Sequence, residues 1–425
     1  MGAFPKGTMA GVALVGAAAL VLTGCTAPAP TPSESPTTGP ESPSAGELAL
    51  TIGTALPVTG NLAFLGPPEI AGTEFAAADI NAAGAGITVE LIQGDSGDTD
   101  NKAYETEIPR LLGEGVSAII GAASSGTSLQ FIDQVVGAGV IQFSPANTSA
   151  AFTTYNDNGL YFRTAPSDVL QGEVLGNLIA ESGAKTLGMI VLNDSYGTGL
   201  AGFTKEAFEA AGGTVVAEPL YNTGDTNFAA QVSEVVAANP DAIALITFEE
   251  VATILPELFA AGVPAEKLYF VDGNLSNFGA SGTDVGGSLA GAKGTLPGLS
   301  IDSITSFTTA LNDFWTGAGN QKLEEYSYAA ESYDAVVLLA LASLAAGSTE
   351  PADIAAKLQE VSGGSGNGTK CTTFAECAAI INDGGVADYD GVSGPITFDE
   401  VGDPTEATIG IYQYGDDNNY SAYEG

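Results

Sequence analysis

Three glycines in a fixed pattern are the first residues of this chain whose spacing suggests chemistry. Gly197, Gly199 and Gly202 form G-x-G-x-x-G after the apolar run "GMIVL", and Glu218 follows further along the chain. In a dinucleotide-binding fold this pattern cradles a pyrophosphate, and its first glycine directly follows a strand. Here the residues "NDSY" separate the strand from Gly197. We therefore expect no nucleotide at this loop and no cofactor in the protein.

A second set of candidate residues lies in loops that follow apolar runs. These loops read "GAASSGTS", "SPANTSAAF", "NDSYGTG", "TFEE" and "VDGNLSN". They contain hydroxyls, small residues and a few acids, and they contain no lysine or arginine. Loops of this kind suit a small zwitterion, which hydrogen bonds, helix N-termini and one carboxylate can hold.

The residue types also argue against several catalytic and metal sites. The chain has no histidine, which excludes Ser-His-Asp and Cys-His nucleophiles and the zinc sites that contain histidine. The run "GDSGDTDNKAYETE" contains Asp95, Asp98 and Asp100, but it lacks the central glycine and the ligand spacing of a calcium loop. We interpret it as a solvated loop that leads into a helix, and we expect no metal site.

A regular alternation of apolar runs and amphipathic segments must position these loops. Strands are expected at 48–57, 87–95, 116–125 and 140–146, with helices at 67–84, 102–115 and 128–139 between them. The alternation resumes at "TLGMIVLND" and continues to "VATILPELFAAG". It predicts parallel sheets covered by helices on both faces, in two α/β lobes. Because ligands bind outside the carboxyl ends of such strands, the hydroxyl-rich loops should line one cleft.

The N-terminal residues resemble an export signal. Lys6 precedes the apolar run "MAGVALVGAAALVL", which leads to "LTGC" at Cys25. The run is short for a membrane span, and "LTGC" resembles a lipobox, whose cysteine is acylated and becomes the mature N-terminus. The alternative is a signal peptide cleaved elsewhere, with an incidental cysteine.

The Pro-, Ser- and Thr-rich stretch 26–46 offers no apolar face to bury and predicts an extended tether. No other apolar segment approaches twenty residues, so we expect no further membrane span. A lipid at one end of the tether would hold the protein at the extracytoplasmic face of the cell membrane.

Cysteine content and charge narrow the compartment and the partners. Cys371 and Cys377 lie in "KCTTFAEC", and a close pair in an exported protein predicts a disulfide that closes a small surface loop. The 51 acidic residues against 11 Lys plus Arg give a net charge of −40. Such a surface repels phosphate backbones, so we expect no nucleic-acid partner.

Five motifs, in this order along the chain, resemble those of one protein family. They are "SPANTSAAFT", "FRTAPSDVLQG", "NDSYGTGLAGF", "YDAVVLLALA" and "SGPITFDEVGDP". From residue 48 to about 414 the chain is similar to the leucine/isoleucine/valine-like substrate-binding proteins of ABC transporters, the periplasmic-binding-protein type I family. The resemblance implies two Rossmann-like lobes with parallel sheets, joined by three hinge crossings near 163–168, 292–298 and 392–399.

The resemblance further implies that the lobes are discontinuous in sequence. The expected segments are a lipoprotein signal peptide at 1–24, the anchored cysteine and tether at 25–46, a first lobe at 47–164 plus about 296–393, and a second lobe at 165–295 plus about 394–425.

The family's ligand site can be carried over to matching positions. It comprises Ser125, Ala146, Thr148, Tyr196, Phe248 and Asp272. The resemblance places a ligand carboxylate on Ser125 and Thr148, and a ligand ammonium on the Ala146 carbonyl and Asp272. Tyr196 would close over the ligand. Phe248, or Thr247 beside it, would form the other wall.

Structural roles are the alternatives at these positions. Ser125 and Thr148 can be helix N-caps, Asp272 can be a turn former before Gly273, and Tyr196 can be a packing tyrosine. The chain also departs from the best-known members of the family. It has Phe64 or Leu65 where they carry a pocket aromatic, and Ser124 where they have a disulfide cysteine. These departures leave the preferred ligand side chain open.

Three classes of function remain. The first is a receptor, without enzymatic activity, that delivers a branched-chain amino acid or a similar zwitterion to an ABC permease and its ATPase subunits. The second is a ligand sensor of the same fold, or a protein that binds a small amide or another polar solute. The third is a hydrolase with paired carboxylates, which ranks last because no motif fixes a second acid near Asp272.

Overall fold

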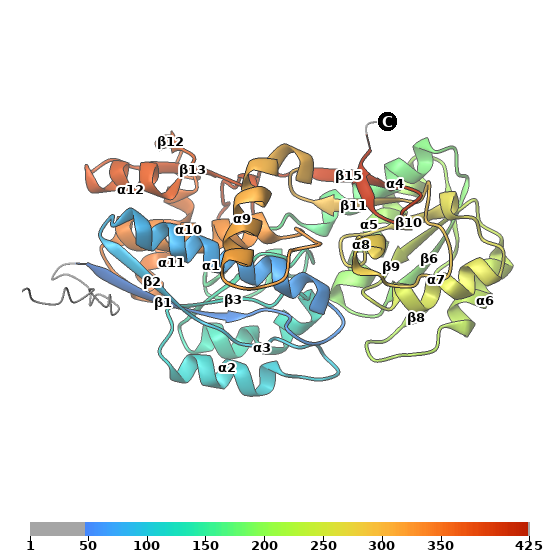
Figure 1. Ribbon diagram of the computed structural model, residues 1–425, viewed down its shortest axis with the longest axis horizontal. Helices are drawn as coiled ribbons and strands as arrows, with labels where there is room; N and C mark the ends of the chain where they lie inside the picture. Colours follow the sequence, from blue (N-terminus) through green and yellow to red (C-terminus); the bar gives the residue numbers. More distant parts are fainter. Residues whose placement is uncertain (1–46, 424–425) are drawn as a thin grey trace, which may run out of the picture. The chain divides into compact units, whose positions relative to one another are not determined.

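The computed structural model describes residues 47–423. The expected signal peptide, Cys25 and the tether lie outside the described residues. The described helices and strands form two lobes, each built on its own sheet (Figure 1).

The sheet of the first lobe has five parallel strands. They are β1 (Leu48–Ala55), β2 (Ile87–Ile92), β3 (Ala118–Gly121), β4 (Ile141–Ser144) and β5 (Tyr161–Arg163), in the order β2-β1-β3-β4-β5. Successive strand residues point to opposite faces. Ile120 therefore packs into one core of the lobe and its neighbour Ile119 into another.

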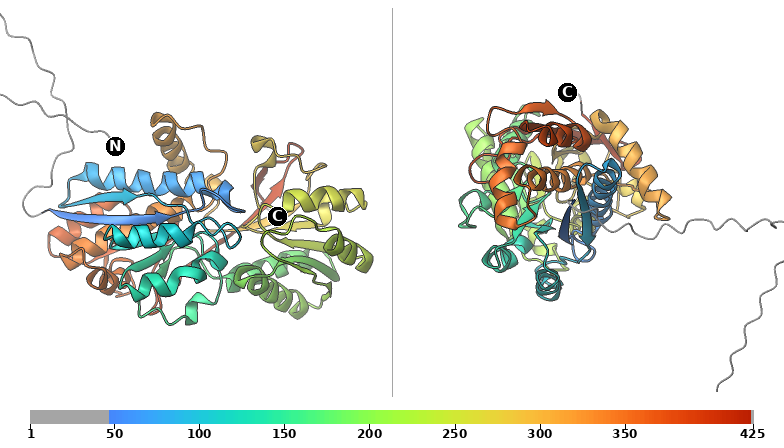
Figure 2. Two further views of the ribbon diagram at one scale, coloured as in Figure 1. Left: turned by 90° about the horizontal axis from the view of Figure 1, so that it is seen from below. Right: turned by 90° about the vertical axis from the view of Figure 1, so that its left-hand side faces the viewer.

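Helices cover both faces of this sheet, as predicted (Figures 1 and 2). One face carries α1 (Gly66–Ala83), α10 (Ala329–Ala346), α11 (Pro351–Val361) and α12 (Phe374–Asn382), and the other carries α2 (Tyr104–Gly113) and α3 (Ser125–Gly137). Helix α9 (Thr305–Gly317) packs beside α1, after the short 3-10 helix η4 (Ile301–Ile304). Two further 3-10 turns are η1 (Ala63–Leu65) and η2 (Phe152–Thr154).

Helix α10 is the one described helix that is long and apolar enough to cross a membrane. Its residues from Ala329 to Ser343 are all buried, and they pack against α1, α11 and the sheet. Most of the helix is apolar because the core of the first lobe surrounds it, and its two buried acids, Glu331 and Asp334, lie near its start.

The second lobe has a larger and mostly parallel sheet. Its strands are β6 (Thr186–Leu192), β7 (Thr214–Ala217), β8 (Leu220–Tyr221), β9 (Ala242–Ile246), β10 (Leu268–Phe270), β11 (Lys293–Pro297), β15 (Ile409–Tyr414) and β16 (Tyr420–Ala422). The order is β16-β15-β11-β10-β9-β6-β7, and β8 also pairs with β6. β15 and β16 run antiparallel at one edge, which the sequence pattern did not predict.

Two pairs of helices cover the second sheet. They are α4 (Asp168–Glu181) with α5 (Ser195–Ala210), and α6 (Ala229–Ala238) with α7 (Val251–Ala260). The 3-10 turn η3 (Ala265–Lys267) precedes β10, and the single helical turn α8 (Phe278–Ser281) follows it. The predicted class, two α/β lobes with parallel sheets, is confirmed.

The second crossing follows β11, which belongs to the second sheet up to Pro297, and so lies at the end of the predicted range 292–298. The third crossing differs from its predicted position. Ile396 and Phe398 lie in the core of the first lobe, and β15 begins only at Ile409. The predicted change of lobe near 394 is therefore too early.

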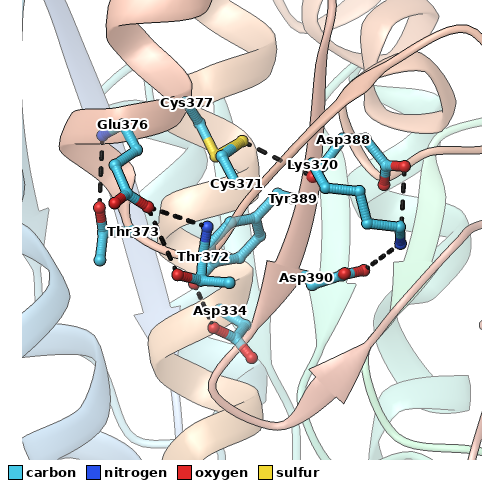
Figure 3. The surroundings of a disulfide bond; sticks show 10 residues. All are labelled: Asp334, Lys370, Cys371, Thr372, Thr373, Glu376, Cys377, Asp388, Tyr389 and Asp390. Atoms are coloured by element: carbon cyan, nitrogen blue, oxygen red, sulfur yellow. Dashed lines mark hydrogen bonds and ion pairs between the residues drawn. A yellow bond between two sulfur atoms is a disulfide. The ribbon is translucent and has the colours of Figure 1, made fainter.

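A small third sheet carries the disulfide. It joins β12 (Thr369–Cys371), β13 (Ala387–Gly391) and β14 (Gly394–Pro395). Cys371 and Cys377 are bonded, as predicted, and they tie the end of β12 to α12 (Figure 3). Lys370 beside them pairs with Asp388 and Asp390.

A buried ion pair fixes the first crossing. Arg163, at the end of β5, is fully buried, and its Nε lies 2.6 Å from Asp403 Oδ1. The guanidinium also donates to the carbonyls of Asn147 and Ser149, at 3.3 and 2.8 Å. It therefore holds the loop that contains Ala146 and Thr148 against the chain that returns from the first lobe.

We expect Asp403→Ala to lower the free energy of unfolding by about 3–5 kcal/mol, because it leaves a buried guanidinium without its carboxylate. Urea unfolding followed by circular dichroism measures this loss. Lys205→Ala is the matched control, since Lys205 and Glu218 lie 3.6 Å apart and are both partly exposed; it should cost less than about 1 kcal/mol. Equal losses in the two variants would contradict the assigned role.

Candidate functional site

One cavity between the lobes brings together all six site residues predicted from the sequence. The first lobe contributes Ser125, Ala146 and Thr148, and the second contributes Tyr196, Phe248 and Asp272. The other lining residues are Leu62, Leu65, Ala123, Ser124, Gly273 and Tyr328. The volume is about 10 Å³, which is close to room for one water molecule. A larger solute requires the two walls to move apart.

Asp272 is the most strongly held group in this cavity. It follows β10, and its Oδ1 accepts hydrogen bonds from Gln171 Nε2 at 2.9 Å and from the Tyr196 hydroxyl at 2.8 Å. Its Oδ2 accepts one from the Tyr328 hydroxyl at 2.7 Å. Burial raises the pKa of Asp272, and the three side-chain donors and the Gly273 amide act against that rise.

The turn-former interpretation of Asp272 does not describe this arrangement. The turn after β10 is held by Asn274, whose Oδ1 accepts from the Val271 amide at 3.0 Å. The Asp272 carboxyl group is directed to side chains from three other parts of the chain.

Two of the three side-chain donors to Asp272 were not predicted from the sequence. Gln171 lies in the motif "FRTAPSDVLQG" and packs at the start of α4. Tyr328 immediately precedes α10 and has a φ of 61°, a left-handed conformation that is uncommon for a tyrosine. Since α10 belongs to the first lobe, the hydrogen bond from Tyr328 to Asp272 joins the two lobes.

A second acid, also missed, lies behind the cavity wall. Asp168 begins α4 and is fully buried. Burial raises its pKa, the charge of Asp272 raises it further, and the Thr148 hydroxyl and the charge of Arg163 lower it. Asp168 is absent from the cavity lining, so the two acids do not face one reaction centre.

Two aromatic rings form the wall of the second lobe. Tyr196 and Phe248 stack with centroids 5.3 Å apart and planes at 16°. Tyr196 lies in the first turn of α5, and Phe248 follows β9. Thr247, the alternative to Phe248, points instead to Asn274 Nδ2, from which its hydroxyl accepts at 2.9 Å.

The N-cap of α3 falls on Ser124, and Ser125 and Thr148 are not caps. Ser124 Oγ accepts from the Thr127 amide at 3.2 Å. Ser125 is the first helical residue, and its Oγ accepts from the Ser149 amide at 3.3 Å. The N-terminus of α3, with its positive dipole end, therefore starts at the cavity wall. No lysine or arginine is among the residues that line the cavity.

The structure shows which of Phe64 and Leu65, in the first loop, lines the cavity. Leu65 lines the cavity, whereas Phe64 lines two neighbouring surface cavities. The acidic loop shapes this wall, because Asp98 accepts from the Asn61 amide at 3.0 Å and Asp95 from the Val58 amide at 3.1 Å. Asp98 is buried, which corrects the expectation of a simply solvated loop. Among residues 47–423 no group of acids has the arrangement of a metal site.

Direct contacts hold the two walls together at the mouth of the cavity. Asn61 Nδ2 donates to Glu250 Oε1 at 3.0 Å, and Ser149 Oγ donates to the Ser195 carbonyl at 3.0 Å. Asp194 caps α5 through the Gly197 amide at 2.7 Å. Its other oxygen lies 2.6 Å from the position that a Cβ on Gly126 of α3 would occupy.

The segment between α9 and α10 also reaches the second lobe. Glu325 accepts hydrogen bonds from the Asn277 amide, from Ser276 Oγ at 3.3 Å and from the Tyr420 hydroxyl at 2.8 Å. Burial raises the pKa of Glu325 to about 7. Tyr328, three residues later, makes the contact to Asp272.

The chain is similar in sequence to known proteins. A profile of the periplasmic binding protein family matches residues 49–402. The Leu/Ile/Val-binding protein homolog 2 of Brucella abortus (strain 2308) is 28% identical over 388 residues, covering 88% of this chain and 93% of the relative. The homolog 1 of Brucella suis is 30% identical over 322 residues, covering 73% and 82%. A chemotactic signal transduction system substrate-binding protein of Halobacterium salinarum is 24% identical over 365 residues, covering 82% and 83%.

Solved structures share the fold. The leucine-binding protein LivK of Thermotoga maritima superposes with a TM-score of 0.71 and 22% identity, covering 88% of this chain and 97% of that one. LivJ of Streptococcus pneumoniae in complex with isoleucine gives 0.69 and 22%, covering 88% and 99%.

The contact between Gly126 and Asp194 yields a prediction about the arrangement of the lobes. Gly126→Ala places a methyl group against the Asp194 carboxylate, an overpacking that costs about 1–3 kcal/mol. We expect the ratio of closed to open molecules to fall by roughly five- to 150-fold. Spin–spin distances between one label on each lobe would lengthen.

The control lies in the same helix. Gly137 ends α3 with open space around its Cβ position, so Gly137→Ala should leave the distances unchanged. Identical distance distributions for both variants would show that Gly126 and Asp194 do not limit closure.

Proposed function

Because the chain belongs to the periplasmic binding protein family, we propose that it is the solute receptor of an ABC importer. It is a binding protein and not an enzyme. In this proposal it holds a small amino acid, branched-chain or similar, between its lobes and delivers it to a membrane permease with ATPase subunits.

The observation that carries the proposal is the convergence of complementary groups on one cavity from both lobes. Asp272 supplies a carboxylate for the ligand ammonium, with the Ala146 carbonyl beside it. Ser125, Thr148 and the N-terminus of α3 supply donors for the ligand carboxylate. A hydrogen bond to a charged group contributes about 1.5–3 kcal/mol. The ligand would leave the cavity chemically unchanged, because no acid–base pair faces the ligand.

The relatives support an amino acid as the ligand. The Brucella proteins are named for leucine, isoleucine and valine, and the LivJ structure holds isoleucine. Tyr196, Phe248 and Leu65 give this cavity the apolar wall that an aliphatic side chain needs. The small volume means that the lobes open to admit the ligand and close on it.

The N-terminal residues support a location at the membrane surface. The lipobox-like "LTGC" would place a diacylglyceryl group on Cys25, and the tether would hold the lobes at the extracytoplasmic face of the membrane. This arrangement keeps the receptor near its permease.

A second candidate function is ligand sensing. The Halobacterium relative belongs by name to a chemotactic signal transduction system. A sensor would use the same cavity and the same closure, and would differ only in the protein that reads the closed state. A small amide or another polar solute remains the alternative ligand.

A ligand screen tests the proposal directly. We expect at least one branched-chain or similar amino acid to raise the melting temperature of the purified protein. At a concentration of about one hundred times Kd, binding stabilises the fold by roughly 2.7 kcal/mol. If no amino acid and no small amide shifts the melting temperature, the proposed function is wrong.

Asp272→Asn tests the assigned counter-ion. We expect it to weaken binding of the amino acid found by the screen by one to three orders of magnitude, about 1.4–4 kcal/mol, measured by calorimetry. Asp302→Asn removes the same charge from an exposed position in η4 and should leave the affinity unchanged. Unaltered affinity in Asp272→Asn would place the ligand ammonium elsewhere.

A further inference from the structure

A second cavity, separate from the cleft, lies where the three crossings meet. Its volume is about 400 Å³, within the range of small-ligand sites. Thr164 and Pro166 of the first crossing line it, together with Gly298 and Leu299 of the second and residues 393–396 and 405–408 of the third. None of its lining residues lines the cleft cavity. We call it the hinge cavity.

Two carboxyl groups line the hinge cavity, the exposed Glu406 and the buried Glu331. Glu331, in the first turn of α10, lines it and is 6% exposed. Within residues 47–423, its own main-chain amide is the only hydrogen-bond donor to this carboxyl group, and no lysine or arginine pairs with it. Gly298 makes room for it, since a Cβ there would lie 2.4 Å from Glu331 Oε1. Burial raises the pKa of Glu331 to about 8.

A second unpaired acid lies behind Glu331. Glu69, on α1, is fully buried, and neither of its carboxyl oxygens has a hydrogen-bond partner. Burial raises the pKa of Glu69, and the charge of Glu331 raises it further. Buried acids without a partner are costly. A cation in the hinge cavity would offset this cost for both groups.

The hydroxyls around Glu331 are set to accept hydrogen bonds. Each one already gives its proton to another group: Thr164 to the Glu331 carbonyl at 3.0 Å, Ser393 to Asp334 Oδ2 at 2.6 Å, Thr405 to the Thr397 carbonyl at 2.8 Å and Thr408 to the Gly298 carbonyl at 3.0 Å. A hydroxyl that has donated its proton offers only its lone pairs. The polar side chains of the cavity therefore complement a donor-rich, positively charged group.

The remaining wall is apolar. Leu299, Ile396 and two prolines face the same space, which favours an alkyl group over a bare inorganic ion. A divalent metal does not fit, because among the described residues no three acids come together as ligands.

We propose that the hinge cavity binds a small organic ammonium ion. Glu331 is its counter-ion, the hydroxyl oxygens accept its N–H groups, and Leu299 and Ile396 contact its alkyl part. This site is separate from the amino-acid site proposed in the cleft, with which it shares no lining residue.

The start of α10 connects the two sites. Tyr328 donates to Asp272 in the cleft, and Glu331, three residues later, faces the hinge cavity. An ion in the hinge cavity touches all three crossings, whose relative positions change as the lobes open and close. Its affinity therefore depends on the arrangement of the lobes, and by linkage it changes the affinity of the cleft to the same extent.

Calorimetry with propylammonium chloride tests the proposal, at a pH above about 8 where Glu331 is ionised. We expect saturable binding to the purified full-length chain. Tetramethylammonium chloride at the same ionic strength, which has no N–H donor, should bind at least tenfold more weakly. Glu331→Gln should weaken propylammonium binding at least tenfold, whereas Asp272→Asn, which acts only through the arrangement of the lobes, should leave saturable binding intact.

Two further measurements separate binding from folding. Circular dichroism checks that each variant is folded. Thr408→Val, which removes one acceptor at nearly constant volume, should weaken binding several-fold if Glu331→Gln does not fold. The proposal is wrong if the parent protein shows no saturable binding, if Glu331→Gln binds as tightly as the parent, or if binding is lost in Asp272→Asn instead.

Discussion

A buried carboxylate without a cation is the constraint on which the rest of the site depends. Asp272 is held by neutral donors, Gln171 and Tyr196 of the second lobe and Tyr328 of the first. Hydrogen bonds to a charged group are worth about 1.5–3 kcal/mol each, and one of them exists only while the lobes are together. The charge of Asp272 and the closure of the lobes are therefore linked. A ligand ammonium would add a positive partner to a carboxylate that is already oriented.

The same solution recurs because the chain has few cations. With 51 acids against 11 Lys plus Arg, most buried acids cannot form ion pairs. Glu325 is held by an amide and two hydroxyls, and Asp334 by the Tyr389 and Ser393 hydroxyls and two amides. Phenols are well suited to this role, since they donate strongly and remain neutral at physiological pH. Arg163, fully buried against Asp403, is the contrasting case, and it fixes a crossing between the lobes.

The sequence predicted those features that depend on local pattern. Apolar runs that alternate with amphipathic segments gave the parallel sheets, and the resemblance to a family gave six positions that do line one cavity. The antiparallel strands β15 and β16 and the buried α10 have no distinctive period, because their neighbours in space decide their burial. The third crossing was predicted too early for a similar reason. Apolar residues such as Ile396 and Phe398 fit the core of either lobe, and only the folded chain shows that they lie in the first.

The missed site residues share one property: each acts on a group far away in sequence. Tyr328 lies 56 residues from Asp272, and Gln171 lies 101 residues from it. No spacing rule connects them, and only the folded chain shows that a tyrosine in a left-handed conformation crosses the cleft.

Two acids that appear equivalent in the sequence differ in their surroundings in the folded chain. Asp272 and Glu331 are both buried, but the first is surrounded by donors and the second by oxygens that have already donated. A carboxyl group surrounded by hydrogen-bond donors is stabilised as an anion. A carboxyl group surrounded by acceptors is stabilised by its own proton or by a bound cation. Because Tyr328 and Glu331 begin the same helix, any motion of α10 changes both environments together.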